Sequence, residues 1–308
     1  QGSSCPVSGE RVPSPDFMKT ILVVYYTQTG QLKRILDSLL SPLAGSSDFQ
    51  ISFLEIQPEN PFPFPWSLRR FLDVFPESVS GAPIPLKAAE IKNPPSYDLI
   101  LLAFQPWYLS PSLPVSSFLK SPAAAQLFNG ANVLTVIGAR NMWVEAFSTV
   151  REQIESRGGR LCGNIALVDR APTLASVVTI VYWMFSGKMD RFLGLFPPPG
   201  VSEADIAGAK RFGEAIGPLL HGNRLDRLEE ELGKLGAAAT NPSLVRLERR
   251  GKKIFTLWSK VIIKAPKLRG LLLNLFLVEL VVALAVASPL NSLFGVLLKL
   301  RNRKSSED

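Results

Sequence analysis

The stretch "VVYYTQTGQLKRI", residues 23–35, joins an apolar run to a helix through a short polar turn. The run "KTILVVYY" (19–26) is continuously apolar, β-branched and aromatic, which is typical of a strand covered on both faces. After the turn, leucine and isoleucine recur at helical spacing from Leu32 to Leu43, which predicts a one-faced helix. The sequence therefore predicts a strand, a tight turn and a helix.

The turn itself holds two hydroxyls, an amide and a glycine. Backbone N–H groups at a helix start, with hydroxyls beside them and a glycine that lets the chain come close, form a cradle for phosphate. The stretch has neither G-x-G-x-x-G spacing nor a Walker lysine, which excludes the usual dinucleotide and nucleoside-triphosphate loops. An ordinary threonine-capped turn is the alternative. The residues concerned are Thr27, Gln28, Thr29, Gly30 and Gln31.

The pattern continues outward as strands alternating with helices, which predicts an α/β fold with a doubly wound parallel sheet. Further strands are expected at 49–56, 98–104, 132–139 and 160–168, and helices at 115–128, 144–157 and 202–220. Ser202 is the expected N-cap of the last helix. This domain is predicted to span residues 18–235, with an apolar insertion at about 173–200 that could cover the sheet, act as a lid or face lipid.

The two ends of the chain differ from this domain. Residues 1–17 are small, polar and proline-bearing, so a disordered extension is expected. The thirteen basic and four acidic residues from Arg246 onward sum to a charge of +9, and the rest of the chain sums to −1, which gives the total charge of +8. Because this basic part is also the most apolar, it predicts a membrane-associated helical segment over 244–304 on the cytoplasmic side, and no nucleic-acid partner.

The long apolar stretch 271–290 within this segment allows three arrangements. It is long enough for a single membrane span, but basic clusters flank both its ends, so a hairpin bent at Ser288-Pro289 or an in-plane anchor suits it equally. A buried helix of a soluble domain is the third.

Few residues offer catalysis without a cofactor. The chain has two cysteines, Cys5 and Cys162, and one histidine, His221. This number of cysteines and histidines is too small for a disulfide framework or a structural zinc site, and it disfavours a His-dependent catalytic triad. No metal site is therefore predicted. Cys162 is expected in the core and His221 at a helix end. A bound cofactor is expected to supply the chemistry.

Two more loops follow predicted strands and belong at the same edge of the sheet as the first turn. In "FQPWYLSPSLPVSSFL" (104–119), Trp107 and Tyr108 could stack on a flat ring, or simply pack. In "IGARNMW" (137–143), Arg140 could supply fixed positive charge, or lie in solvent.

These three loops resemble, in order and spacing, the FMN-binding loops of flavodoxin-like proteins over about residues 18–170. The resemblance implies a five-stranded sheet of order 2-1-3-4-5 and FMN as cofactor. Leu32 stands where flavodoxins usually have a second threonine, which predicts weakened or lost FMN binding. Phosphate contacts would come from 27–31 and ring contacts from Pro106, Trp107, Tyr108, Gly138, Ala139, Arg140 and Asn141.

A narrower resemblance is to bacterial flavodoxin-like dialkylresorcinol condensing enzymes, in "PENPFPFPWSLRRFLDVFPESV" (58–79), "QPWYLSPSLP", "ARNMW" and "TLASVVTIVYWMFSGK". It implies an oxidoreductase that forms a dialkylcyclohexanedione or aromatises it to a resorcinol. The substrate would be lipophilic, a ketosynthase and an acyl carrier protein would be partners, and Tyr108 and Arg140 would be catalytic. An electron-carrying flavodoxin and a non-catalytic membrane scaffold for the ketosynthase or carrier protein are the alternatives.

Overall fold

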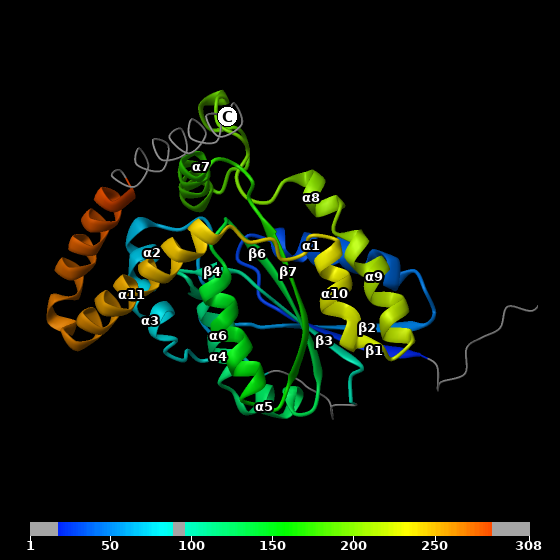
Figure 1. The fold of residues 1–308 in the computed structure, drawn as a ribbon. Helices are drawn as coiled ribbons and strands as arrows, with labels where there is room; N and C mark the ends of the chain where they lie inside the picture. Colours follow the sequence, from blue (N-terminus) through cyan, green and yellow to red (C-terminus); the bar gives the residue numbers. More distant parts are fainter. Residues whose placement is uncertain (1–17, 89–95, 285–308) are drawn as a thin grey trace, which may run out of the picture.

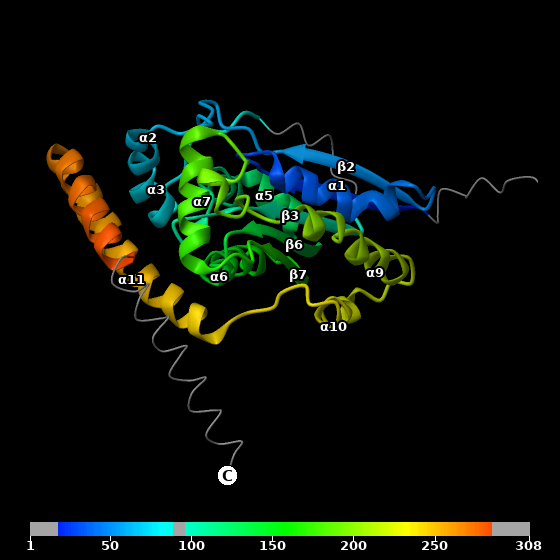
Figure 2. The same cartoon turned by 90° about the horizontal axis from the view of Figure 1, so that it is seen from above.

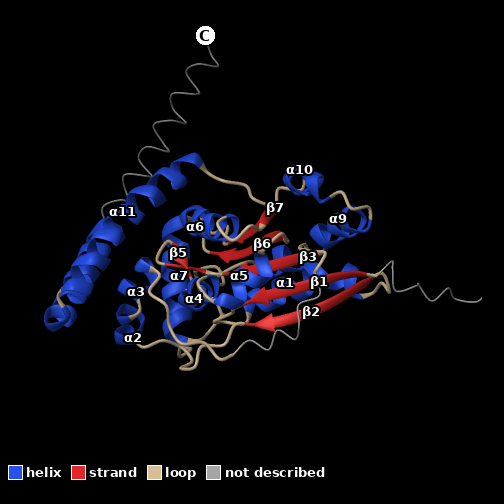
Figure 3. Ribbon diagram, turned by 90° about the horizontal axis from the view of Figure 1, so that it is seen from below, coloured by secondary structure: helices blue, strands red, loops and turns tan. Residues whose placement is uncertain are grey.

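A computed structural model describes residues 18–88 and 96–284. Its centre is a five-stranded sheet of order β2-β1-β3-β6-β7, in which every neighbouring pair is parallel (Figures 1 and 3). With the separate short hairpin β4-β5 set aside, this is the predicted order 2-1-3-4-5. The predicted doubly wound sheet is therefore confirmed.

The five strands of the central sheet lie within one residue of the predicted ranges, whereas the short strands β4 and β5 were not predicted. The strands are β1 (Lys19–Tyr25), β2 (Phe49–Glu55), β3 (Leu99–Phe104), β4 (Pro106–Trp107), β5 (Ser110–Pro111), β6 (Asn132–Ala139) and β7 (Arg160–Val168). The helices are α1 (Gln31–Ala44), α2 (Leu68–Asp73), α3 (Phe75–Ser80), α4 (Leu113–Leu119), α5 (Pro122–Phe128), α6 (Val144–Glu155), α7 (Thr173–Ser186), α8 (Glu203–Ala207), α9 (Lys210–His221), α10 (Leu228–Lys234) and α11 (Pro242–Lys264). In the described part of the chain, 3₁₀ turns lie at Phe192–Gly194, Leu225–Arg227 and Pro266–Leu268.

Two hydrophobic cores, one on each face of the sheet, explain the continuous apolar strand. Val23 and Tyr25 lie in the core shared with α1, α9 and α10, whereas Val24 and Tyr26 lie in the core shared with α4, α5 and α6. Successive strand residues point to opposite faces, so both sets must be apolar when both faces are covered. Figure 1 shows the helices on either side.

Two predicted helices are each interrupted. The predicted helix 115–128 is α4 followed by α5, because Pro122 has no N–H to continue a helix and Ser121 caps the new one by accepting from the Ala124 N–H at 3.2 Å. The predicted helix 202–220 is α8 followed by α9, with the break at Gly208 and Ala209. Ser202 is its N-cap, as predicted.

The apolar insertion forms α7, which lies over the ends of the strands (Figures 1 and 2). Its C-terminal half packs on the proline-rich segment that follows β2. The backbone N–H of Trp66 donates to the Met184 carbonyl at 2.8 Å, and the rings of Phe64 and Trp183 meet edge to face. The insertion therefore covers an edge of the sheet, one of the arrangements the sequence left open.

The C-terminal part is a pair of helices beside α2 and α3. After α11 the chain turns at Ala265–Leu268, and a second helix runs over 269–284 (Figure 2). Among the described residues, no helix is both long and apolar enough to cross a bilayer. The predicted bend at Ser288-Pro289, and the end of the apolar stretch, lie outside the described residues.

Candidate functional site

The loop after β1 has the geometry of an anion cradle. Gly30 is the N-cap of α1, with φ of 79°, a left-handed conformation that favours glycine. Its own N–H donates to Thr27 Oγ1 at 3.1 Å, and a Cβ placed on it would meet no atom within 4 Å. The N–H groups of the first turn of α1 have no carbonyl partners within the helix. Open space at a helix N-terminus beside two threonines suits a phosphate.

The glutamines of this loop are used to connect it to neighbouring segments. The Gln28 amide donates to the Pro63 carbonyl at 2.8 Å and the Gln28 N–H donates to Gln105 Oε1 at 3.1 Å. Gln31 is buried; its amide donates to the Val201 carbonyl at 3.2 Å and accepts from the Val201 N–H at 3.0 Å. The Gln31 side chain therefore holds the end of the insertion rather than facing the cradle.

The position of Leu32 in the fold explains why an apolar residue stands where flavodoxins usually have a threonine. Its side chain is fully buried, and its Cδ1 atom lies 3.4 Å from where a Cβ of Gly138 would stand. The leucine fills the core between α1 and β6. The loop thereby lacks one hydroxyl group, and the first turn of α1 packs on β6 through the leucine side chain.

Trp107, at the second loop, belongs to an aromatic cluster beside the cradle. Its ring centroid is 5.1 Å from that of Phe62, 5.6 Å from Trp66 and 5.9 Å from Tyr26, all edge to face. Tyr26 in turn donates its hydroxyl to Gln28 Oε1, and burial raises its pKa further above 10. The first two predicted loops are thus brought together, with residues 62–66 closing over them.

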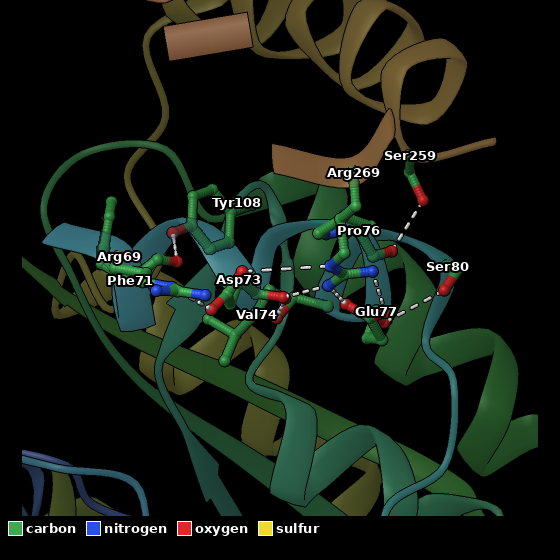
Figure 4. Close-up of polar contacts among 11 residues, drawn as sticks. Arg69, Phe71, Asp73, Val74, Pro76, Glu77, Ser80, Tyr108, Ser259 and Arg269 are labelled. Atoms are coloured by element: carbon green, nitrogen blue, oxygen red, sulfur yellow. Dashed lines mark hydrogen bonds and ion pairs between the residues drawn. The ribbon is translucent and has the colours of Figure 1, made fainter. Parts of the chain in front are cut away.

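Tyr108 lies at the tip of the β4-β5 hairpin and points away from the cradle. Tyr108 and Leu109 have φ of 50° and 59°, the two positive values of a type I′ turn, which normally takes Asn-Gly. The Tyr108 hydroxyl donates to the Phe71 carbonyl, as Figure 4 shows, and burial raises its pKa well above 10. The ring packs on Phe71 and Phe75. In this conformation the phenol is a packing group, and its predicted catalytic role stays a prediction.

The third loop begins later than the resemblance implies. Gly138 and Ala139 still belong to β6 and pair with Leu167 and Val168. Arg140 is half-buried, and burial lowers its pKa below the usual value of an arginine, an effect that the nearby Asp169 carboxylate opposes. Asp169 accepts from Ser176 Oγ at 2.6 Å, at the start of α7. Arg140 thus lies beside Asp169 at the end of β6, and its role toward a ligand stays a prediction.

A cavity of about 390 Å³ opens next to Asn141. Its lining includes Trp143, Asp169, Asn241 and Glu248, so it lies between the loops after β6 and β7 and the start of α11. The Asn141 Oδ1 atom is buried without a hydrogen-bond partner among the described residues. This acceptor is buried beside the cavity.

Sequence reasoning missed four contributors to this region. Trp66 lies in the aromatic cluster, and its buried Nε1 atom has no hydrogen-bond partner in the part of the chain that the structure describes. Gln105 accepts from the Gln28 N–H of the first loop. Glu248 and Lys252 of α11 reach the site region from more than a hundred residues away in the sequence. Glu248 left one signal, since it is the only acidic residue in the strongly basic stretch 246–278.

The comparisons with known proteins find only distant similarity. No protein-family model and no curated protein matches the chain. A flavoprotein from Lactobacillus acidophilus solved with FMN is 18% identical over 48% of this chain and 93% of its own, with a TM-score of 0.39. A flavodoxin from Fusobacterium nucleatum bound to FMN is 16% identical over 71% and 98%, with a TM-score of 0.33. At these values the fold assignment stands on the strand order itself.

Proposed function

We propose that this protein binds FMN and acts as a flavoprotein. The observation that carries the proposal is the open cradle at Gly30, which lies at the carboxyl end of β1. There the strand order reverses, because β1 lies between β2 and β3. In open α/β sheets ligands bind at this switch point, and for the order 2-1-3-4-5 the ligand there is FMN in flavodoxin.

The residues present fit both ends of the cofactor. Thr27, Thr29 and the first turn of α1 would hold the phosphate. Trp107, in the loop after β3, would lie along the ring.

FMN titration tests this proposal. We expect quenching of FMN fluorescence on binding, with riboflavin binding much more weakly because it lacks the phosphate. Thr27→Val combined with Thr29→Val should weaken FMN binding at least about 100-fold, since each of the two lost hydrogen bonds to a charged group contributes about 1.5–3 kcal/mol. The same pair should leave riboflavin binding unchanged. Equal affinity for FMN and riboflavin would overturn the phosphate assignment.

We further propose that the reaction is aromatisation of a lipophilic dialkylcyclohexane-1,3-dione to a dialkylresorcinol. The conversion removes one hydride and one proton from the ring; bound FMN would accept the hydride. Arg140 would steady the negative charge that develops on the substrate oxygen when the proton leaves. Trp107 would fix the ring orientation. The likeness of residues 58–79, 105–114 and 173–188 to dialkylresorcinol condensing enzymes supports this choice.

Turnover of a synthetic dione under air tests the reaction. Resorcinol formation should require FMN and should fall at least 100-fold in Arg140→Met, because a preorganised charge opposite a developing oxyanion is worth about 3 kcal/mol. Full activity of Arg140→Met would remove this role. A protein that binds FMN, exchanges single electrons and leaves the dione untouched would instead be an electron carrier, and one that binds no FMN would be a scaffold.

The proposed substrate carries two alkyl chains and would partition into lipid, so we also propose a location at the cytoplasmic side of the membrane. A ketosynthase and an acyl carrier protein are the proposed partners, because the dione would be assembled from carrier-bound acyl chains. Co-purification of these proteins with the full chain from its native host tests the partnership.

A further inference from the structure

The helix pair formed by α11 and residues 269–284 has an exposed apolar face. On α11 three of the exposed apolar residues follow i, i+3 and i+7 spacing, and on the second helix four of them follow i, i+4, i+7 and i+11 spacing. Each of these two sets therefore forms a line along its helix. The outer stripe, as this face is called below, consists of Ile254, Leu257, Val261, Leu271, Leu275, Val278 and Val282. Leu257 is 64% exposed and Val278 is 60% exposed, so these side chains are not packed on the domain.

The opposite face of the same pair is already occupied by the domain. The Phe75 and Phe276 rings stack with centroids 3.8 Å apart, and the Ser259 hydroxyl donates to the Pro76 carbonyl at 2.7 Å. Arg269 forms a two-pronged ion pair with Glu77 at 2.8 and 2.7 Å (Figure 4). The inner face therefore fixes the pair on α3, and the outer stripe is the face left for a second partner.

Positive charge accompanies the outer stripe. The exposed lysines of this part are Lys253, Lys260, Lys264 and Lys267. Within residues 250–284 the sequence has one acidic residue, Glu279, and its carboxylate accepts from Trp258 Nε1 at 2.8 Å. A lysine can extend along an apolar surface and place its ammonium group beside it. The face thus combines large aliphatic side chains with a one-signed charge.

We infer that the outer stripe lies in the plane of an anionic lipid bilayer, with the aliphatic side chains among the acyl chains and the lysines at the headgroups. This inference deepens the membrane location proposed above and is independent of FMN binding. An apolar face flanked by lysines is the pattern of in-plane helices. A soluble acidic partner would engage the lysines, but it would leave the aliphatic stripe unexplained, which is why lipid is the occupant.

A fluorophore on the stripe tests the inference directly. Leu257→Cys, in full-length protein carrying Cys5→Ser, is labelled with an environment-sensitive dye; Cys162 is buried and stays unlabelled. Vesicles of phosphatidylcholine with 30% phosphatidylglycerol should shift the emission to the blue, and vesicles of phosphatidylcholine alone should do so far less. The same dye on Lys210→Cys, on the distant helix α9, should not respond. Emission that is blue before vesicles are added would show that the protein itself covers the stripe.

Two sets of substitutions separate charge from apolar contact in vesicle sedimentation. Lys253→Gln, Lys260→Gln and Lys264→Gln together should lower partitioning about 100-fold, since each lysine near an anionic surface contributes about fivefold. Leu257→Glu with Leu275→Glu should abolish it. Leu193→Glu with Leu195→Glu, which alters the most exposed apolar residues of the insertion, is the matched control and should change little.

Each outcome decides the matter. Unchanged partitioning in Leu257→Glu with Leu275→Glu, or loss confined to the control, overturns the inference. Partitioning that is lost with the lysines but kept with both glutamates would show electrostatic adsorption alone, and would overturn the insertion of the aliphatic side chains. Because these exposed residues do not touch the cradle, FMN titration of the same variants should stay unchanged, so failure of lipid docking and failure of the flavin proposal are told apart.

Discussion

The Glu248 carboxylate of α11 accepts a hydrogen bond from the backbone N–H of Glu145 at 2.9 Å. Glu145 lies in the first turn of α6, where N–H groups lack partners within the helix. The cap for this helix therefore comes from a residue 103 positions later, because Trp143 at the N-cap provides no side-chain bond. The C-terminal helices are thus fastened to the sheet domain at α6 as well as at α3.

This contact predicts a pH-dependent stability effect at Glu248. Burial raises the pKa of Glu248 above 4.5, while the N–H groups of Glu145 and Val144 oppose the rise. A carboxyl with a raised folded-state pKa contributes most below its unfolded pKa, and that contribution is lost as the pH rises through the folded value. Glu248→Gln keeps an acceptor without the charge, so it should be more stable than the wild type at pH 7 and equal to it near pH 4.

Urea unfolding at the two pH values measures this difference. Glu248→Ala is the companion variant: it removes the acceptor and should cost about 1–3 kcal/mol at both pH values, because the α6 N–H groups are left buried without a partner. A Glu248→Gln protein that is less stable than the wild type at pH 7 would show that the charge on this carboxylate is a net benefit.

Gly30→Ala should affect both stability and FMN binding. The added Cβ meets open space, so the cost is the left-handed backbone, about 1–2 kcal/mol. Thermal unfolding should show that loss, and FMN titration should show weaker binding because the cradle backbone shifts. Gly233→Ala is the control: Gly233 lies in α10, is exposed and also has open space, so alanine there should stabilise by about 0.5–1 kcal/mol.

Tyr108→Phe separates a packing role from a catalytic one. Removing the hydroxyl leaves the Phe71 carbonyl without this donor and should cost about 1–3 kcal/mol of stability. If packing is its whole role, dione turnover per folded, FMN-loaded protein should stay within about twofold of the wild type. A 100-fold fall in dione turnover with unchanged FMN affinity would instead support the catalytic role that the sequence resemblance implied for Tyr108.

Phe276→Ala should loosen the C-terminal helix pair without unfolding the sheet. Phe276 is buried and stacks on Phe75, and loss of a buried phenylalanine typically costs about 3–5 kcal/mol. Hydrogen exchange should speed up over residues 242–284 and stay slow in β1, β3 and β6. Leu275→Ala, one residue away on the exposed face, should leave exchange unchanged. Equal acceleration in the central strands would mean that the pair and the sheet unfold together.

The sheet was predictable because its central strands β1, β3 and β6 are buried on both faces and therefore read as largely apolar runs, as "KTILVVYY" does. The turn at Thr27 and Gly30 was predictable for a similar reason, since it directly follows such a run. Tyr108 was harder to place: a non-glycine type I′ turn at residues 108–109 gives no sequence signal, and the turn directs its side chain away from the cradle. Trp66, Gln105 and Glu248 act through tertiary contacts that local periodicity does not encode.

The contacts of α11 with the β4-β5 hairpin have a consequence for how the protein is made. Lys252 donates to the Ser110 hydroxyl, 142 positions earlier, and a Cβ on Gly251 would stand 3.1 Å from Leu109. Domains fold from the N-terminus as the chain leaves the ribosome, so the sheet can assemble before α11 has been synthesised. The β4-β5 hairpin, which carries Trp107, therefore makes its contacts with α11 only after residue 252 has been translated. Nascent chains halted before that point should bind flavin poorly.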